Sequence, residues 1–514
     1  MPAACAWQSP PDLLRFGVAT ADAPAPNDPK PLTKTEYLSG AQCLRQLWWR
    51  RHEPGAVELQ PDRVLQDLFD QGQQVGALAR ERFPGGVLVP AAMSREDRTR
   101  RTAEAIDAGA TVLFEAAFLA DGVFVVCDVL VREPDGWHLI EVKSASRRKD
   151  EHLHDLAVQA HVLARAGLAV TRLGVMHLNP EFAHPDGGDL FARADVTALA
   201  RAHTSDVPAQ IEAQRAALAG PLPASPIGLH CAEPWECAFK ERCWPADPWH
   251  IGRLHGVGAK RADQWMRSGV TDMRQLPEKA LANPTVRRQL TAMVRGTRIV
   301  ERSLHHALAP FDERPLGFLD FETVARAVPV WPAMSPWEMA AAQFSYHELG
   351  PDGSVRHEEH LAEGPEDARP LVARRLVDAT RHAARIVTYS SFEKSRIRAL
   401  QLAVPALAPE LAALEAKLVD LLPVVREHVY DPAFLGSFSL KTVLPALVPD
   451  LSYQDLVIVD GRLASVEIAR LLFVADRIPL AERDRVRRDL LAYCERDTWA
   501  MVRLLEVLRG LAGR

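Results

Sequence analysis

The chain has 514 residues, a formal net charge of −6 at neutral pH, 47% hydrophobic residues and 25% charged residues. This length exceeds what one hydrophobic core normally holds and suggests about three domains. The composition is typical of a globular protein, and no run of about 18 apolar residues predicts a membrane-spanning helix. The slightly negative charge argues against a protein that coats nucleic acid through bulk electrostatics.

Residues 1–30 are rich in Pro, Ala and Asp, and this composition predicts a disordered arm. The first residues lack the basic start, apolar block and cleavage site of a secretory signal. We therefore expect a cytoplasmic protein without a membrane partner.

The segment 31–249 is predicted to form an α/β domain. Apolar residues at three and four spacing indicate helix over about 33–82. Residues 111–143 contain three β-rich runs separated by Asp121-Gly122 and by Pro134-Asp135-Gly136, which predicts a three-stranded meander. A helix over about 150–167 and a further strand, VTRLGVMHL, follow.

Asp128, Glu141 and Lys143 form the first candidate site. Glu141 and Lys143 are two apart in the third predicted strand and so share one face, while Asp128 lies on the neighbouring strand. Two carboxylates suit Mg²⁺ or Mn²⁺, and the lysine can stabilise developing negative charge. An exposed strand edge with ordinary charges remains an alternative.

This segment resembles the PD-(D/E)XK nucleases of the RecB type. The resemblance implies that Asp128 and Glu141 bind metal, that Lys143 serves catalysis, and that Gln159 on the following helix completes the site. Leu163 stands where the family often has a tyrosine.

Three cysteines, Cys231, Cys237 and Cys243, are spaced C-x5-C-x5-C, and Cys43 lies far upstream. Four thiolates can hold zinc or an iron–sulfur cluster, and spacing alone does not separate the two. The arrangement resembles the iron–sulfur nucleases of the RecB and AddB type, which implies a [4Fe-4S] cluster tying the two ends of the nuclease domain together. Three reduced cysteines in a loop are the alternative.

The segment 250–310 is predicted to be a helical linker. Leu254 to Gly258, followed by Lys260 and Arg261, resembles the hairpin of a helix-hairpin-helix motif, whose backbone N–H groups and basic side chains can meet a phosphate. A plain turn between two helices is the alternative.

Residues 311–514 are predicted to form a second α/β domain with its own acids. Asp320 and Glu322 lie two apart on the strand LGFLDFETV and share a face. Glu393 follows a later strand, and Tyr493 and Asp497 are four apart on the last helix, so they also share a face. Such acids can bind two divalent ions about 4 Å apart.

This ordered set resembles the DEDD exonucleases of the DnaQ type, in the tyrosine subclass. The resemblance implies an RNase H-like fold, two metals held by Asp320, Glu322, Glu393 and Asp497, and a water oriented by Tyr493. The family carries Asp where this chain has Glu393. Asp420 and the stretch Ser439-Leu440-Lys441 lie between the motifs and suit either a substrate groove or a structural role.

The two resemblances together indicate a bacterial fusion of a RecB/AddB-type nuclease with a DnaQ-like exonuclease. We expect a metal-dependent nuclease with two active sites, exonucleolytic and acting in DNA repair, recombination or defence, with DNA favoured over RNA as partner. The sequence contains no G-x-x-x-x-G-K-[ST] phosphate loop, so a helicase partner would have to supply unwinding. An RNA-processing 3′–5′ exonuclease and a non-catalytic iron–sulfur scaffold for nucleic acid are the alternatives.

Overall fold

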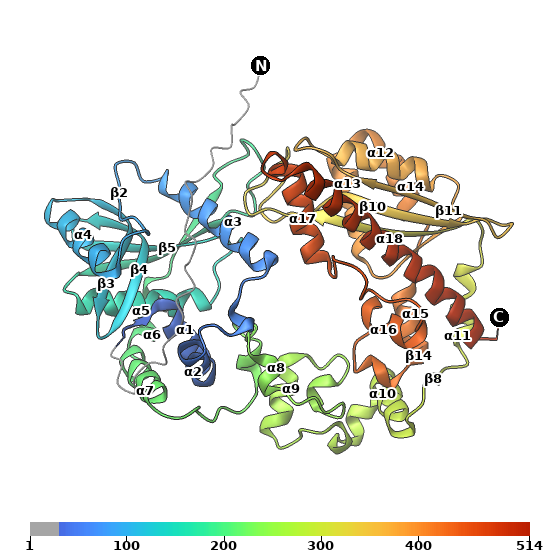
Figure 1. Cartoon of the computed structure of the whole chain (residues 1–514), viewed down its shortest axis with the longest axis horizontal. Coiled ribbons are helices and arrows are strands. Elements are labelled where there is room, and N and C mark those ends of the chain that lie inside the picture. The colour runs from blue at the N-terminus through green and yellow to red at the C-terminus, as the bar shows by residue number, and fades with distance from the viewer. Residues whose placement is uncertain (1–29, 514) are drawn as a thin grey trace.

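The computed structural model describes residues 30–513, so the predicted arm lies outside the described residues except for Lys30. The described chain is a mixed α/β protein with two large β-sheets joined by a helical segment (Figure 1), and a third sheet of two strands. Below, the first unit means residues 30–219, the connecting segment residues 220–315 and the second unit residues 316–513.

The first unit is built on a seven-stranded sheet with the order β2-β3-β4-β5-β6-β7, and β1 pairs with the start of β4. The predicted meander is present as the antiparallel strands β3, β4 and β5, and β6 then pairs with β5 in parallel. The strands are β1 (Leu32–Thr33), β2 (Val87–Leu88), β3 (Val112–Ala120), β4 (Val123–Glu133), β5 (Gly136–Lys143), β6 (Val170–Leu178) and β7 (Phe191–Asp195).

The helix expected over 33–82 is three helices. Cys43 has an extended backbone and separates the first two, and a turn at Pro54-Gly55 ends the helical stretch that follows. Asp62 starts the third helix by accepting a hydrogen bond from the Leu65 amide. The helices of this unit are α1 (Lys34–Gln42), α2 (Leu44–His52), α3 (Arg63–Arg80), α4 (Arg95–Asp107), α5 (Glu151–Arg165), α6 (Thr197–Thr204) and α7 (Val207–Ala219).

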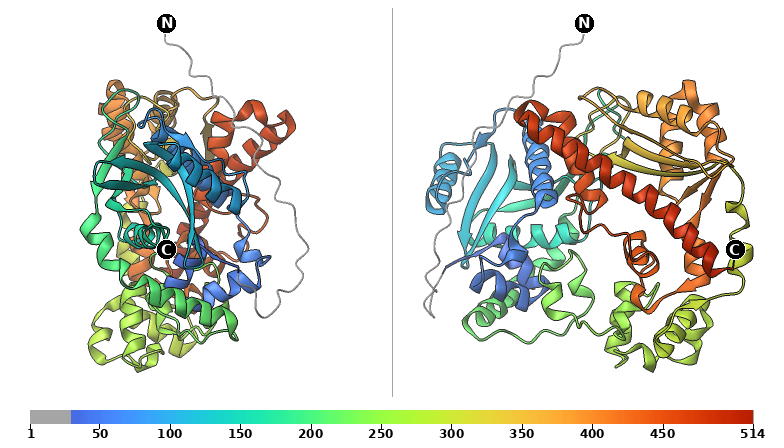
Figure 2. Two further views of the ribbon diagram at one scale, coloured as in Figure 1. Left: turned by 90° about the vertical axis from the view of Figure 1, so that its left-hand side faces the viewer. Right: turned by 45° about the vertical axis from the view of Figure 1, so that its right-hand side comes forward.

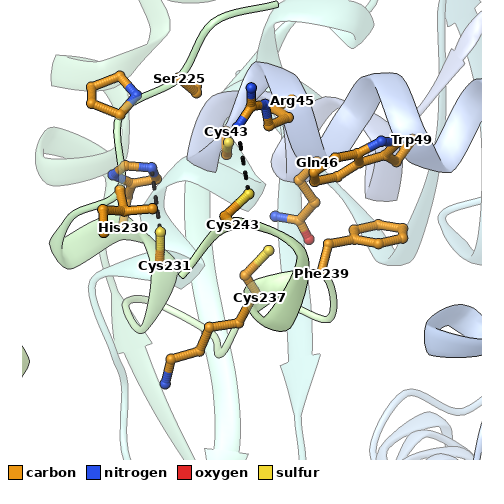
Figure 3. A pocket seen from close by; sticks show the side chains of 13 residues that line it. Cys43, Arg45, Gln46, Trp49, Ser225, His230, Cys231, Cys237, Phe239 and Cys243 are labelled. Carbon is orange, nitrogen blue, oxygen red and sulfur yellow. Dashed lines mark hydrogen bonds between the residues drawn. The ribbon is translucent and has the colours of Figure 1, made fainter. Parts of the chain in front are cut away.

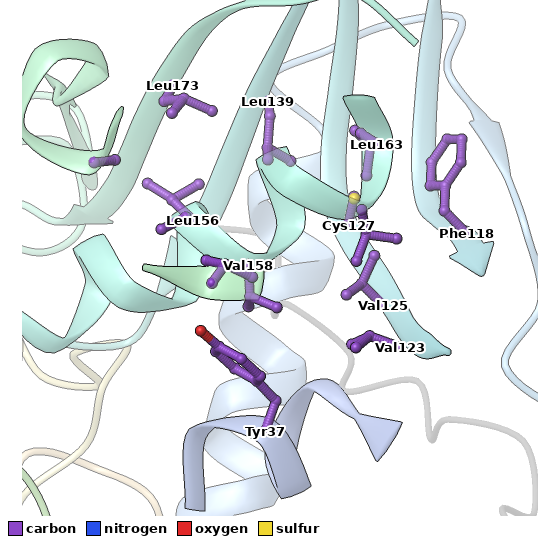
Figure 4. Packing of buried hydrophobic residues seen from close by; sticks show 14 of the residues in the cluster. Tyr37, Phe118, Val123, Val125, Cys127, Leu139, Leu156, Val158, Leu163 and Leu173 are labelled. Atoms are coloured by element: carbon purple, nitrogen blue, oxygen red, sulfur yellow. The ribbon is translucent and has the colours of Figure 1, made fainter. Parts of the chain in front are cut away.

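One face of the first sheet packs against α5, because the apolar side of that helix is turned towards alternate residues of β4 and β5 (Figure 4). Leu156 and Leu163 on α5 are fully buried against Cys127 and Leu139 of the strands. Leu163, the residue in place of the family tyrosine, is therefore part of the hydrophobic core rather than of a substrate surface.

The connecting segment consists mainly of short helices and contains one short strand. The hairpin predicted at Leu254–Gly258 is a turn in which Gly256 and Gly258 adopt left-handed backbone conformations, and α9 begins at Gly258. Its elements are α8 (Lys240–Cys243), α9 (Gly258–Arg267), α10 (Pro284–Arg295), β8 (Ile299–Val300) and α11 (Leu304–Ala307), of which β8 pairs with β14 of the second unit.

The second unit has a five-stranded sheet in the order β11-β10-β9-β12-β13, with β9 at its centre. β9 pairs antiparallel with β10 and parallel with β12. The strands are β9 (Leu316–Val324), β10 (Ala340–Leu349), β11 (Val355–Leu361), β12 (Arg385–Thr388), β13 (Leu418–Asp420) and β14 (Val429–Tyr430), of which β14 lies outside this sheet.

Helices pack on both faces of this sheet, and the longest, α18, runs diagonally along the whole unit (Figure 2). Its buried residues contact β9 and β10, which fixes the helix across the centre of the sheet. The helices are α12 (Arg369–Thr380), α13 (Phe392–Ala403), α14 (Ala408–Glu415), α15 (Leu421–His428), α16 (Leu440–Leu447), α17 (Gly461–Phe473) and α18 (Leu480–Leu511).

The two units contact each other directly through α3. Asp67 forms an ion pair of 2.7 Å with Arg326, and the Gln71 side-chain oxygen accepts a hydrogen bond of 2.6 Å from the Ala327 amide. Ala327 is also buried among apolar residues of the first unit. The position of α3 beside the second unit is therefore specified by polar and apolar contacts.

Within residues 30–513, no single helix has both the length and the apolar character required to cross a membrane. One bent pair of helices, Phe392–Ala403 with Pro405–Glu415, meets those criteria by length and composition.

Candidate functional site

The first acidic site lies where β4 and β5 meet α5. The Gln159 amide donates hydrogen bonds to Glu141 (2.7 Å) and to Asp155 (2.9 Å), and Gln159 is fully buried. Lys143 contacts the same two carboxylates at 2.7 and 2.6 Å. Asp128 accepts a hydrogen bond of 2.7 Å from the Val142 amide, directly beside Glu141. The structure thus brings the four predicted residues together.

Two residues of this site were not predicted from the sequence. Lys34, at the start of α1, forms ion pairs of 3.0 Å with both Glu141 and Asp155. Asp155 lies four residues before Gln159 and so on the same face of α5, which is a signal the sequence carries. Lys34 had no such signal, because it is 107 residues away from Glu141.

Burial and charge act in opposite directions in this site. Burial, together with the neighbouring charge of Glu141, raises the pKa of Asp128 to about 8, against the attraction of Lys34 and Lys143. Burial alone would also raise the pKa of Asp155, but the two ammonium groups outweigh it and hold that pKa well below its usual range. The lysines therefore neutralise much of the acidic charge, and a divalent cation would compete with Lys34 for Glu141.

The four predicted cysteines, Cys43, Cys231, Cys237 and Cys243, line one small pocket (Figure 3). Cys43, at the break between α1 and α2, comes from the first unit, and the other three cysteines come from α8 and the loop before it in the connecting segment. Trp49 and Phe239 also line the pocket. No three of their sulfurs belong to a group of ligand atoms within 4.8 Å of one another in the described chain.

The basic groups around this pocket favour negative charge within it. Arg45 lies 3.7 Å from the Cys243 sulfur, and His230 lies 3.7 Å from that of Cys231. Four thiolates beside two basic groups suit either a zinc ion or an iron–sulfur cluster.

The second acidic site is formed by β9 and α18. Carboxylate oxygens of Asp320, Glu322 and Asp497 lie within 4.8 Å of one another. Glu393, at the first turn of α13, lines the same cavity, as does Tyr493. The five residues predicted for this site therefore surround one space, although they are up to 177 positions apart in the chain.

Burial dominates the electrostatics of these acids. Asp320 and Glu322 have pKa values raised well above their usual range by burial and by the charge of Asp497. Burial also raises the pKa of Glu393 to about 8 and that of Asp497 to about 6. One oxygen of Glu393 has no hydrogen-bond partner among the described residues. Uncompensated buried carboxylates are what a divalent-cation site requires.

Lys441 and Tyr453 complete the site. The Lys441 ammonium donates a hydrogen bond of 2.7 Å to the Tyr493 hydroxyl and lies over the ring of Tyr493. The Tyr453 hydroxyl donates to Asp497. From the sequence, Asp420 and the stretch around Lys441 suited either a substrate groove or a structural role. Lys441 lines the cavity. Asp420 instead accepts a hydrogen bond from the Leu422 amide at the start of α15. Nothing in the sequence singled out Tyr453.

The cavity over the second site has a volume of about 920 Å³ and extends beyond the second unit. Its wall includes Val64, Asp67, Leu68 and Gln71 of α3 in the first unit, and His255 of the predicted hairpin. His255 is held there by a hydrogen bond of 3.1 Å to the carbonyl oxygen of Gly436. Two other parts of the chain thus help to enclose the acids of the second unit.

Lys260 and Arg261, the basic residues after the hairpin, are exposed at the start of α9. The hairpin itself packs on the second unit, since the ring of His255 contacts Phe438 at 4.8 Å between centroids. This contact is consistent with a plain turn between helices. Phosphate binding by the exposed Lys260 and Arg261 stays a prediction.

A family model described as "Domain of unknown function (DUF2779)" matches residues 317–439. That span contains Asp320, Glu322 and Glu393 but ends before Lys441 and α18. No curated protein matches the chain. A solved structure titled "Crystal structure of SSO0001" is similar over 42% of this chain and 86% of its own, with 12% sequence identity and a TM-score of 0.20. The site's chemistry therefore has to be argued from its own residues.

Proposed function

We propose that the chain is a metal-dependent nuclease with two carboxylate sites, one in each unit. The observation that carries the proposal is the convergence of Asp320, Glu322 and Asp497 within 4.8 Å, beside a tyrosine hydroxyl and in a cavity large enough for a nucleotide. Cavities of roughly 300–1,000 Å³ are usual for small-molecule sites. The central position of the acid-bearing β9 supports an RNase H-like interpretation of this unit.

Divalent cations bound by these carboxylates would polarise the scissile phosphate and neutralise charge that develops on it. The residues of the chain have separate roles. Asp320 and Glu322, on adjacent same-face positions of β9, would hold one cation rigidly, while Asp497 and Glu393 approach from two helices. In the absence of cation, burial keeps these acids partly protonated, so cation binding should release protons.

The Tyr493 hydroxyl would orient the attacking water. It accepts a hydrogen bond from Lys441 and is itself hydrogen-bonded to Asp497, so a water beside Asp497 would come within reach of this hydroxyl. In the hydrolysis, that water would lose one proton to solvent as its oxygen forms a bond to phosphorus and the bond from phosphorus to the leaving 3′ oxygen breaks. The leaving oxygen would take up a proton from solvent, and the products would be a 5′-phosphate and a free 3′ hydroxyl.

The first site is proposed to be a PD-(D/E)XK site. Asp128 and Glu141 would bind the cation, Gln159 fixes the orientation of Glu141, and Lys143 lies beside the same carboxylate to stabilise negative charge on the phosphate. Lys34 forms ion pairs with both Glu141 and Asp155. Its ammonium would be released to contact a phosphate oxygen if a cation took its place at Glu141.

The cysteine pocket is proposed to hold a [4Fe-4S] cluster bound by Cys43, Cys231, Cys237 and Cys243. Its role would be structural, since it would join the break between α1 and α2 of the first unit to α8 and the loop before it in the connecting segment. None of the four cysteines lines the cavity of the second site.

The experiment is digestion of end-labelled single- and double-stranded DNA and RNA with Mg²⁺ or Mn²⁺. Asp128→Ala and Asp320→Ala should each remove a different activity, while Asp484→Asn, an exposed position on α18, should remove none. Shortening from the 3′ end that depends on Asp320 would support an exonuclease. Binding of nucleic acid without any cleavage by the wild-type chain would contradict the proposal and favour the scaffold.

A further inference from the structure

A second cluster of metal-ligand residues lies outside both acidic sites, between α18 and the edge of the second sheet. His347 on β10 and His357 on β11 are direct partners in the strand pairing. Glu495 faces them from α18. One ring nitrogen of each histidine and a carboxylate oxygen of Glu495 all lie within 4.8 Å of one another. None of the three lines the cavity of the second acidic site.

The hydrogen bonds around His347 determine which of its nitrogens carries the proton. The Thr498 hydroxyl donates to the backbone oxygen of Glu495 at 2.9 Å, so it accepts from His347 Nδ1, also at 2.9 Å. This leaves the Nε2 lone pair of His347 free. Burial and the neighbouring His357 lower the pKa of His347 to about 4, so the ring stays neutral at neutral pH.

His357 is held in the same manner. Its Nε2 bonds to the Ser345 hydroxyl at 3.0 Å, and that hydroxyl lies 2.8 Å from Thr498. The Nδ1 atom is then the nitrogen that faces away from this pair of hydroxyls. Histidines that bind metals usually have the other ring nitrogen fixed by such a hydrogen bond, which orients the ring and sets the tautomer.

We propose that His347, His357 and Glu495 bind one transition-metal ion, with Zn²⁺ as the preferred ion. Two imidazoles and a carboxylate suit zinc, whereas Mg²⁺ and Ca²⁺ prefer oxygen ligands alone. The two rings are stacked, with centroids 4.3 Å apart, and ligation requires the three ligand atoms, which lie within 4.8 Å of one another, to approach further. Glu495 is exposed and can move towards the rings, and the partly buried His357 can tilt while its Nε2 keeps the hydrogen bond to Ser345. A solvent molecule would take the fourth position.

Such an ion would fasten α18 to the sheet at a position that matters for the second acidic site. Glu495 lies two residues from Asp497 on α18. Ser345, which orients His357, pairs across the strands with Asp320. The ion would therefore connect the helix that carries Asp497 with the strand next to Asp320. The metal-binding proposal does not depend on nuclease activity.

The test is the number of Zn²⁺ ions retained by the full chain after equilibrium dialysis with millimolar Mg²⁺ present, measured by elemental analysis. Mg²⁺ competes with Zn²⁺ for the carboxylate sites, and any zinc bound there or at the cysteines is common to all variants. His357→Ala and Glu495→Gln should each retain one Zn²⁺ fewer than wild type. His360→Ala is the matched control, because His360 lies on β11 beyond the cluster and contacts Phe344.

Thermal unfolding provides a second readout. Zn²⁺ should raise the Tm of the wild type and of His360→Ala, because an ion that binds only the folded chain stabilises it. The rise should be absent in His357→Ala and Glu495→Gln, both of which alter partly or fully exposed side chains and keep the buried His347. Equal zinc content and an equal Tm rise in wild type and in both variants would overturn the proposal.

Discussion

Asp497→Asn should stabilise the metal-free protein while it removes activity at the second site. Asp497 is 8% exposed, and burial raises its pKa from an ordinary value of 3.8 to about 6. Asn is nearly the same size, and its side-chain oxygen can still accept the hydrogen bond from Tyr453. The substitution therefore removes the buried charge and leaves the packing of α18 in place.

The size of the effect follows from the pKa of Asp497. Each pKa unit corresponds to about 1.36 kcal/mol, so a rise from 3.8 to about 6 corresponds to about 3 kcal/mol. Because the folded-state pKa lies above the unfolded value, the favourable contribution of the protonated acid is complete below about pH 4. It is lost as the pH rises through about 6. The variant should thus equal wild type near pH 4 and exceed it by about 3 kcal/mol at pH 8.

The assay is differential scanning calorimetry of both proteins in EDTA across this pH range, with Asp484→Asn as the control on the same helix. For a unit of about 200 residues, 1 kcal/mol corresponds to about 2–4 °C, so the Tm of the variant should be about 6–12 °C higher at pH 8. With Mg²⁺ the wild type should recover most of the difference, since it binds the ion and the variant does not. A variant that is less stable than wild type at pH 8, or a difference that does not change with pH, would refute the argument.

Three further predictions concern other residues of the sites. Tyr493→Phe removes the hydroxyl that is held by Lys441 and should lower kcat on labelled single-stranded DNA by about 10²-fold or more, with KM little changed in steady-state assays. Lys34→Met removes the ammonium that competes with a cation for Glu141. In calorimetric titrations, the double variant Lys34→Met/Asp320→Asn should therefore bind Mn²⁺ more tightly than Asp320→Asn alone. Equal Mn²⁺ affinity of the two proteins would exclude this competition. Cys231→Ser should abolish iron content and absorption near 400 nm, and a colourless wild-type protein would already exclude the cluster.

Most of what could be predicted came from spacings of two residues in strands and of three or four residues in helices. The two-residue spacing of Asp320 and Glu322 indicates a shared strand face, and the four-residue spacing of Tyr493 and Asp497 indicates a shared helix face. Both spacings hold in the structure, on β9 and α18. The mixed α/β class was predicted from the same periodicities. The break between two helices at Cys43 was not, because its extended backbone does not change the helical spacing of the apolar residues. The catalytic roles of these residues remain predictions.

Residues that depend on distant contacts had no such pattern. Lys34 reaches Glu141 because α1 packs against β4 and α5, and Tyr453 reaches Asp497 from a loop 44 residues earlier. Neither type of residue is unusual in its local sequence. Asp155 is the exception, because its four-residue spacing from Gln159 indicates a shared face of the same helix. Contacts between segments far apart in the chain are decided by tertiary packing, which single-sequence patterns do not contain.

The contribution of α3 to the wall of the second cavity makes the surroundings of the second site depend on the first unit. Val64, Asp67, Leu68 and Gln71 line the cavity, and Asp67 adds a carboxylate to it. A substitution at Leu68 would therefore change the surroundings of acids that belong to a different sheet. The second unit expressed alone would lack this wall and would have a more open cavity, so the two units are not interchangeable modules.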